Sequence, residues 1–255
     1  MGPPVFGETS LAALPELSVV VPVKDEVDNA VPLLMEICTA LRGKTTFEVL
    51  FVDDASRDGT VEALLAARPQ APELRVLKHL KNSGQSRAVR TGVIAARGRL
   101  VATLDGDGQN DPADIPLLLA VWAREEGADK GLGLVAGQRI KREDNWIKRV
   151  SSRVGNGVRQ WLLKDGTRDT GCGLKLFARD AFLSLPYFDH IHRFMPAMML
   201  REGYRISHAD VRHRPRSHGT SKYGTLDRLL VSLSDLVGVR WLLRRSRRPE
   251  GIEEL

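Results

Sequence analysis

Three short apolar runs, each followed at once by acidic residues, constrain the fold of this chain most strongly. LSVVVPV (17–23), FEVLFV (47–52) and LVATL (100–104) are rich in β-branched residues, as is typical of strands buried on both faces. Segments with helical spacing lie between them. This alternation predicts an α/β fold with a mostly parallel sheet flanked by helices, in which the carboxyl ends of the strands share one edge.

The other expected elements follow from the same periodicity. In the first half we expect one more strand at 74–77 and helices at 29–41, 60–67, 85–96 and 116–126. From Gly127 onward the pattern weakens. There we expect strands at 134–136 and 174–177 and helices at 145–163, 193–202 and 226–243.

The charge of the chain favours a polyanionic partner. The net charge is +6 and the pI is about 9.5, which suits nucleic acid, an anionic membrane or a phosphorylated substrate. Basic residues concentrate in two blocks, at 139–153 and at 240–248. Because the sequence predicts an acidic edge and lacks interleaved exposed aromatic residues, we do not expect nucleic acid to be the partner.

The cysteines and the apolar segments indicate the compartment. Cys38 and Cys172 are the two cysteines, and the region after Met1 lacks the blocks of a signal peptide, so we expect a reducing cytosol. The most apolar segment of this kind is 226–243. Charged residues, among them Asp227 and Asp235, interrupt it, so it does not suit a membrane span. With Trp241 and five arginines from Arg240 to Arg248, this segment suits a helix lying in a lipid interface. The alternative is a helix that packs on the core of the protein or in a dimer interface. A homo-oligomer is therefore also possible for this chain.

The third acidic group has the composition of a metal site. Asp105 and Asp107 follow a predicted buried strand, and Gln109 adds a neutral oxygen. Hard oxygen ligands suit Mg²⁺ or Mn²⁺, which share their coordination with substrate phosphates. The alternative is an ordinary surface turn, because Asp and Gly favour turns. The histidines at 190, 192, 208, 213 and 218 are scattered, so we do not expect them to form a zinc site.

Four motifs carry a resemblance to a known family. VVVPVKDE, VDDASRDGT, KNSGQSRAVRTG and TLDGDGQNDP, in this order, resemble the family 2 glycosyltransferases, which have the GT-A (nucleotide-diphospho-sugar transferase) fold. The similarity is greatest to dolichol-phosphate mannose synthases and bacterial polyprenyl-phosphate glycosyltransferases. It implies a GT-A domain 17–224, with a nucleotide-sugar-binding half 17–126 and an acceptor half 127–224. From the Pro/Gly-rich composition before it we expect a flexible segment 1–16. From its apolar stripe and basic end we expect an amphipathic basic helix and tail at 225–255.

The resemblance also assigns site residues. For the metal it implies Asp105, Asp107 and Gln109. For the acceptor phosphate it implies Lys148, Arg149, Ser152 and Asn156, and then Ser221 and Lys222 in the loop that also holds Arg216, Gly219 and Tyr223. The implied catalytic residues are Asp107, Arg139, Asp169, Arg216 and Lys222, and Gly171 belongs to the segment of Asp169. The implied nucleotide-sugar contacts are Pro22, Lys24, Glu26, Val52, Asp53, Asp54, Asp105, Gly106, Asp107, Gln109, Arg139 and Lys175.

The chemistry of the reaction explains these residue types. The departing nucleoside diphosphate develops charge, which a divalent cation and basic side chains stabilise. A phosphomonoester acceptor with a second pKa of about 6 is largely a dianion and needs no general base, and no His–Asp pair stands out in the sequence. A single in-line displacement inverts the anomeric configuration. Asp169 would serve as a base if the acceptor were a neutral hydroxyl.

The resulting prediction is an inverting hexosyltransferase. We expect GDP-mannose or a UDP-sugar as donor, a polyprenyl or dolichyl-type phosphate as acceptor, and peripheral attachment at the cytoplasmic face of the cell membrane. The alternative is a soluble family 2 glycosyltransferase acting on a saccharide or protein hydroxyl. A Rossmann oxidoreductase is disfavoured, because no G-x-G-x-x-G follows the first predicted strand.

Overall fold

The computed structural model describes residues 14–128, 131–140, 162–215, 225–246 and 253. Within these ranges seven strands form one sheet in the order β3-β2-β1-β4-β6-β5-β7. The strands are β1 (Leu17–Val23), β2 (Phe47–Asp53), β3 (Leu74–Lys78), β4 (Leu100–Thr103), β5 (Leu132–Arg139), β6 (Lys175–Ala178) and β7 (Arg205–Val211).

The sheet is mostly parallel, as predicted. β1 pairs in parallel with β2 and β4, β2 with β3, and β5 with β7. β6 lies between β4 and β5 and runs antiparallel to both. β6, a strand from the second half of the chain, thus joins the strands of the two halves into one sheet.

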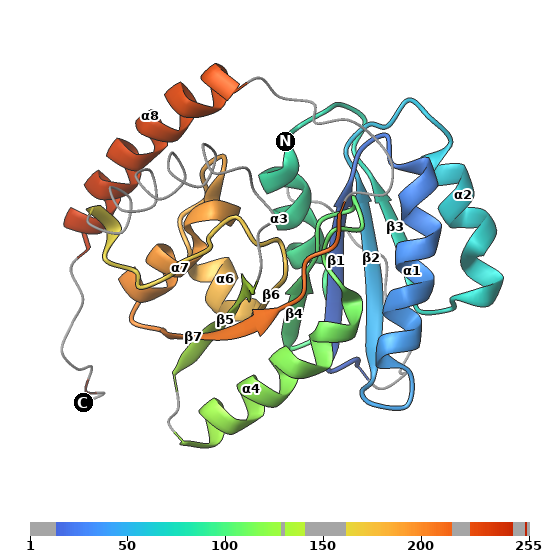
Figure 1. The fold of residues 1–255 in the computed structure, drawn as a ribbon, viewed down its shortest axis with the longest axis horizontal. Coiled ribbons are helices and arrows are strands. Elements are labelled where there is room, and N and C mark those ends of the chain that lie inside the picture. Colours follow the sequence, from blue (N-terminus) through green and yellow to red (C-terminus); the bar gives the residue numbers. More distant parts are fainter. Residues whose placement is uncertain (1–13, 129–130, 141–161, 216–224, 247–252, 254–255) are drawn as a thin grey trace.

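Helices cover both faces of the sheet (Figure 1). α1 (Val27–Leu41), α2 (Thr60–Ala67) and α4 (Ile115–Ala128) cover one face, and α3 (Gln85–Ala95), α6 (Arg179–Ser184) and α7 (Ile191–Arg201) the other. Short 3-10 turns occupy Arg68–Gln70 and Pro112–Asp114.

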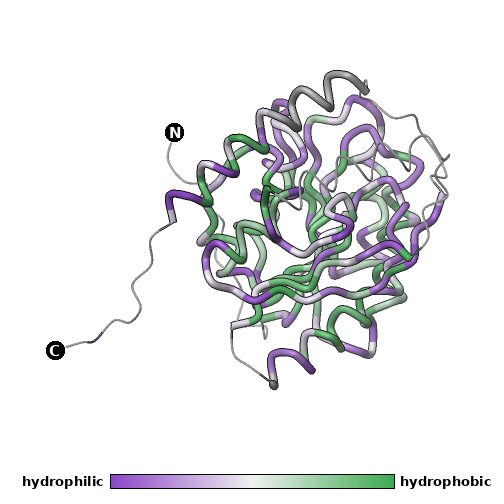
Figure 2. The backbone as a smooth tube through the Cα atoms, turned by 60° about the vertical axis from the view of Figure 1, so that its left-hand side comes forward, coloured by the Kyte–Doolittle hydropathy of each residue, from purple (hydrophilic) through white to green (hydrophobic). Residues whose placement is uncertain are grey.

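The alternating direction of side chains along each strand explains why helices pack on both faces of the sheet. Val19 and Val21 of β1 pack with α1, whereas Val20 packs with α3, because successive strand residues point to opposite faces. Figure 2 shows the resulting concentration of hydrophobic residues inside the molecule.

The second half differs most from the predictions. β5 is longer than the predicted strand 134–136, and both β7 and α6 were not predicted. β7 has the sequence RISHADV, in which polar residues weaken the strand pattern. α6 has only six residues, which is too short for helical periodicity to be recognised. Of the predicted helix 145–163, residues 145–161 lie outside the described residues.

The C-terminal helix α8 (Thr225–Arg244) packs on the α3–α7 side of the sheet. Val239 is buried there, whereas Val237 and Trp241 are 72% and 58% exposed. Arg240 donates to the carbonyl of Leu162, 2.7 Å away. In the described part of the chain, no helix combines the length and apolarity that a membrane crossing requires.

Candidate active site

The carboxyl ends of β1, β2 and β4 bring the three acidic groups to one edge of the sheet. Val23 of β1 lies opposite Asp53 of β2, and Val20 lies opposite Thr103 of β4. The Asp54 amide donates to the Val23 carbonyl at 2.9 Å, so the acidic turns begin side by side. The predicted acidic edge is confirmed.

Asp105 lies at the inner end of this edge. Its Oδ1 accepts a hydrogen bond from Gln85 Nε2 of α3 at 2.8 Å. A Cβ on Gly173 would lie 2.3 Å from Asp105 Oδ2, so position 173 has no room for a side chain. Burial raises the pKa of Asp105, the charge of Asp107 raises it further, and Lys175 opposes both. A cation between the two carboxylates would relieve their repulsion.

Asp107 and Gln109 lie on the open side of the same turn, and both are half-buried. Asp107 Oδ1 accepts the amide of Gln109 at 3.2 Å. Gly106 is packed closely, because a Cβ there would lie 2.8 Å from the Pro22 carbonyl. Among the described residues no group of three or more His, Cys, Asp or Glu could hold a metal ion. By their chemistry, the two carboxylates and the side-chain oxygen of Gln109 would suit Mg²⁺ or Mn²⁺, with phosphate and water as the remaining ligands.

Lys175 begins β6 and is buried close enough to Asp105 for their charges to interact. Its Nζ donates to the carbonyl of Cys172. Burial lowers the pKa of Lys175, while the charges of Cys172, Asp105 and Asp169 oppose this shift. The side chain of Lys175 therefore lies close to the predicted donor site.

Arg139, the last residue of β5, pairs with Asp169. Its Nε lies 2.5 Å from Asp169 Oδ2 and its Nη2 lies 2.7 Å from Oδ1. Burial opposes the charged guanidinium, but the hydrogen bonds and the charge of Asp169 outweigh it and raise the pKa of Arg139. Two residues predicted as catalytic thus form one ion pair.

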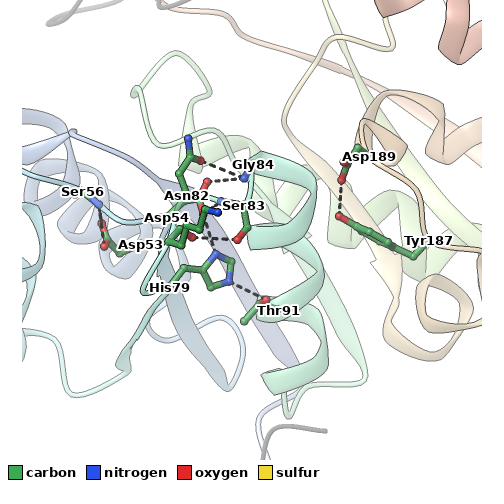
Figure 3. A network of polar contacts seen from close by, with 11 residues as sticks. Asp53, Asp54, Ser56, His79, Asn82, Ser83, Gly84, Thr91, Tyr187 and Asp189 are labelled. Atoms are coloured by element: carbon green, nitrogen blue, oxygen red, sulfur yellow. Dashed lines mark hydrogen bonds and ion pairs between the residues drawn. The ribbon is translucent and has the colours of Figure 1, made fainter. Parts of the chain in front are cut away.

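Asp54 organises the loop before α3 (Figure 3). Its Oδ1 accepts the Ser83 amide and contacts His79 Nδ1, and its Oδ2 accepts the Gly84 amide, each at 2.8 Å. The Nε2 of His79 lies 3.0 Å from Thr91 Oγ1, so both ring nitrogens of His79 have partners. The pairing of His79 with Asp54 was not apparent in the sequence.

The remaining predicted donor contacts lie on the same turns. Asp53 accepts the Ser56 amide at 3.2 Å, and Glu26 Oε2 accepts Asn29 Nδ2 at 2.7 Å. Lys24 is half-buried. The side chain of Val52 is fully buried and packs with α3, so it does not face the edge.

A hollow of about 290 Å³, which includes open solvent, lies between the acidic edge and α7. Pro22, Asp105 and Lys175 line it, together with Gln85 and His192, which the sequence analysis did not assign to a site. Burial and the nearby charge of Lys175 hold the pKa of His192 well below its usual value. The helices that carry Gln85 and His192 meet only in the folded chain, so the sequence alone held no signal for this arrangement.

Ion pairs fix the segment after β7 to the turn that follows the acidic edge. Arg212 donates to Asp114 Oδ1 at 2.8 and 2.9 Å, and Arg214 pairs with Asp111 at 2.7 Å. The Arg214 amide donates to the Gln109 carbonyl at 3.0 Å. These contacts tie the predicted acceptor half to the predicted metal motif.

Nine predicted residues lie outside the described residues. They are Lys148, Arg149, Ser152, Asn156, Arg216, Gly219, Ser221, Lys222 and Tyr223.

Residues 18–185 match the model of the glycosyl transferase family 2 domain. The chain belongs to glycosyl transferase family 2. It is therefore a glycosyltransferase, and the predicted family is confirmed. One relative, dodecaprenyl-phosphate galacturonate synthase from Rhizobium johnstonii, is 33% identical over 96% of this chain and 72% of its own length. Undecaprenyl-phosphate 4-deoxy-4-formamido-L-arabinose transferase from Edwardsiella ictaluri is 35% identical over 87% of this chain, which spans 66% of that relative.

Solved structures support the GT-A fold of this family 2 chain. Glucosyl-3-phosphoglycerate synthase from Mycobacterium tuberculosis, in complex with Mn²⁺, UDP and glucosyl-3-phosphoglycerate, superposes with a TM-score of 0.66 at 18% identity. The match covers 92% of this chain and 81% of that one. The same enzyme with Mn²⁺, UDP-glucose and phosphoglyceric acid gives a TM-score of 0.68 at 17% identity, over 92% and 81%. The predicted fold class is confirmed.

Proposed function

We propose that this family 2 glycosyltransferase transfers a hexose from GDP-mannose or a UDP-sugar to a polyprenyl or dolichyl-type phosphate. The observation that carries the proposal is the carboxylate pair Asp105 and Asp107, at the edge where the acidic turns of β1 and β2 also lie. The relatives supply the acceptor class, since their names specify dodecaprenyl phosphate and undecaprenyl phosphate.

The donor is proposed to span three strand ends. The nucleoside would lie over β2 and β1, near Asp53 and Lys24, and the diphosphate would lie at the end of β4. Asp105, Asp107 and Gln109 would hold Mg²⁺ or Mn²⁺, which stabilises charge on a departing nucleoside diphosphate. In support, burial and the charge of Asp107 disfavour an unpaired Asp105 carboxylate.

Basic residues are proposed to hold the two anionic substrates close together. Two like charges 4 Å apart repel by about 4 kcal/mol at an effective dielectric constant of 20, so cations must offset this repulsion. We assign this role to Arg139, Arg216 and Lys222 at the transfer site. We assign Lys148, Arg149, Ser152, Ser221 and Lys222 to the acceptor phosphate.

The transfer is proposed to be a single displacement that inverts the anomeric configuration. The acceptor phosphate is largely a dianion at neutral pH and attacks without a base. Asp169, which the resemblance implies as catalytic, would act by orienting Arg139, as their two short hydrogen bonds suggest.

Peripheral attachment at the cytoplasmic face of the cell membrane is part of the proposal. Its support is the α8 stripe, by which we mean the exposed residues Val237, Trp241, Arg244 and Arg245. An interfacial Trp and basic residues near the end of a helix suit anionic lipid headgroups.

The test uses the purified chain with a panel of radiolabelled nucleotide-sugars and polyprenyl phosphate, with and without Mn²⁺. We expect radiolabel in the organic phase only when polyprenyl phosphate and Mn²⁺ are both present. Radiolabel on an added saccharide or protein hydroxyl, with none on the lipid, would favour the alternative of a soluble family 2 glycosyltransferase.

A further inference from the structure

His192 connects the two halves of the chain beside the hollow. It is the second residue of α7, and its Nδ1 lies 2.7 Å from the hydroxyl oxygen of Ser86, the second residue of α3. Ser86 is 4% exposed. The imidazole is therefore oriented by a buried partner from the donor half.

The second ring nitrogen remains available. Within the described part of the chain, Ser86 is the only hydrogen-bond partner of His192. Because His192 also lines the hollow next to Lys175 and Asp105, Nε2 is the polar atom that it can offer to a ligand. A neutral imidazole offers one donor and one acceptor, so the Ser86 contact determines which of the two Nε2 presents.

The strand order indicates which part of a donor would reach this hollow. The sheet runs β2-β1-β4-β6, with the proposed nucleoside over β2 and β1 and the proposed diphosphate at the end of β4. The hollow lies beyond β4, where Gly173, Lys175 and α7 form its wall. The group attached to the far side of a nucleoside diphosphate is the sugar.

We propose that His192 is a specificity-determining residue that hydrogen-bonds a substituent of the transferred sugar through Nε2, while Ser86 positions its ring. This inference rests on the proposed function, because it requires a nucleotide-sugar donor. It assigns sugar recognition to a residue that touches neither the nucleoside nor the metal-binding turn.

Gln85 and Lys175 do not replace His192 in this role. Gln85 Nε2 is hydrogen-bonded to Asp105, and Lys175 Nζ is hydrogen-bonded to the Cys172 carbonyl. Gln85 Oε1 also has no partner among the described residues, but its amide is held by Asp105 of the predicted metal motif. His192 is held by Ser86, which lies outside that motif.

The test compares binding of nucleotides with and without a sugar. Affinities of UDP, GDP, UDP-glucose, UDP-galacturonate and GDP-mannose are measured calorimetrically in Mn²⁺ for the wild type, His192→Ala and Ser86→Ala. A hydrogen bond contributes about 1 kcal/mol, or roughly fivefold in affinity. We expect His192→Ala to weaken binding of the preferred nucleotide-sugar about fivefold and to leave the matching nucleoside diphosphate within about twofold. Ser86→Ala should lose less in the same direction.

Two controls make each outcome decisive. His208→Ala removes another partly buried histidine, whose Nε2 contacts Thr167, and should not change sugar discrimination. His192→Gln keeps a hydrogen-bonding group and serves if the alanine variant does not fold; it should change the ranking of the sugars. Equal losses for sugar-linked and sugar-free nucleotides, or no loss, would overturn the assignment to His192. A wild type that binds none of the nucleotide-sugars would instead overturn the proposed function.

Discussion

Arg139 and Asp169 satisfy each other's charge through two hydrogen bonds of 2.5 and 2.7 Å. Both side chains are largely buried, at 12% and 11% exposure. A carboxylate held in this way has its proton-accepting oxygens directed at a guanidinium. This geometry favours a role in orienting Arg139 over a role as a general base.

We predict that Asp169→Asn retains transfer to polyprenyl phosphate within about tenfold of the wild type, because a dianionic acceptor needs no base. A missing general base costs about 10² to 10⁴ in rate. Rates are measured with saturating donor, and circular dichroism checks the fold. A loss of more than 100-fold in a folded variant would argue for a hydroxyl acceptor.

The three contacts of Asp54 predict a structural effect. Asp54→Ala leaves the Ser83 amide and His79 Nδ1 without this acceptor, and the Gly84 amide keeps only Asn82 Oδ1 at 3.3 Å. Because these contacts are only partly buried and a hydrogen bond contributes about 0.5–1.5 kcal/mol, we expect the free energy of unfolding to fall by about 1–2 kcal/mol without nucleotide. Urea unfolding measures the loss, and hydrogen exchange should accelerate at Ser83 and Gly84.

Asp58→Ala is the matched control for Asp54→Ala. It removes a nearby carboxylate that accepts the Val27 and Thr60 amides but contacts neither Ser83 nor Gly84. Exchange at these two amides should remain slow in Asp58→Ala. Unchanged stability and exchange in Asp54→Ala would show that Asp54 serves the nucleotide alone.

The first half of the fold could be predicted because its strands are buried on both faces. Val19, Val20 and Val21 are all fully buried, so their apolar run needs no tertiary information to be recognised as a strand. The acidic residues after such strands meet at one edge for the same reason. The mostly parallel sheet and the Asp105–Asp107 turn were predictable on these grounds.

Contacts between distant segments could not be predicted. In β7, at the edge of the sheet, Ser207 and His208 interrupt the alternation of polar and apolar residues, so the local pattern typical of a half-buried strand is weak. Asp54 was expected to contact the nucleotide, and its partners come from residues 79–84. The place of His192 at the hollow depends on the packing of α7 against α3, which no short motif encodes.

Arg149→Ala tests the acceptor assignment that the resemblance implies. If Arg149 binds the acceptor phosphate, its loss removes a charge-assisted contact of about 1.5–3 kcal/mol, or roughly 10- to 150-fold. We expect kcat/KM for polyprenyl phosphate to fall by about this factor, with hydrolysis of the donor nearly unchanged. Arg124→Ala, at an exposed arginine of α4, is the control. Equal losses in transfer and hydrolysis would contradict the acceptor role.

The α8 stripe predicts lipid binding. We expect Trp241→Ala combined with Val237→Asp to reduce flotation with anionic vesicles at least about fivefold, because an apolar contact is lost and a like charge is added. Leu117→Asp, at a 43% exposed leucine of α4, should float like the wild type. Equal flotation of both variants would show that α8 does not contact the membrane.

Binding of Mn²⁺ tests the central claim most directly. Free Mn²⁺ is followed by its electron paramagnetic resonance signal during titration of the wild type and of Asp107→Ala, each with and without UDP or GDP. We predict that one of these nucleotides increases the Mn²⁺ affinity of the wild type at least about tenfold and does not change that of a folded Asp107→Ala variant. Equal nucleotide-dependent Mn²⁺ binding in both proteins would contradict a donor site built on Asp105 and Asp107.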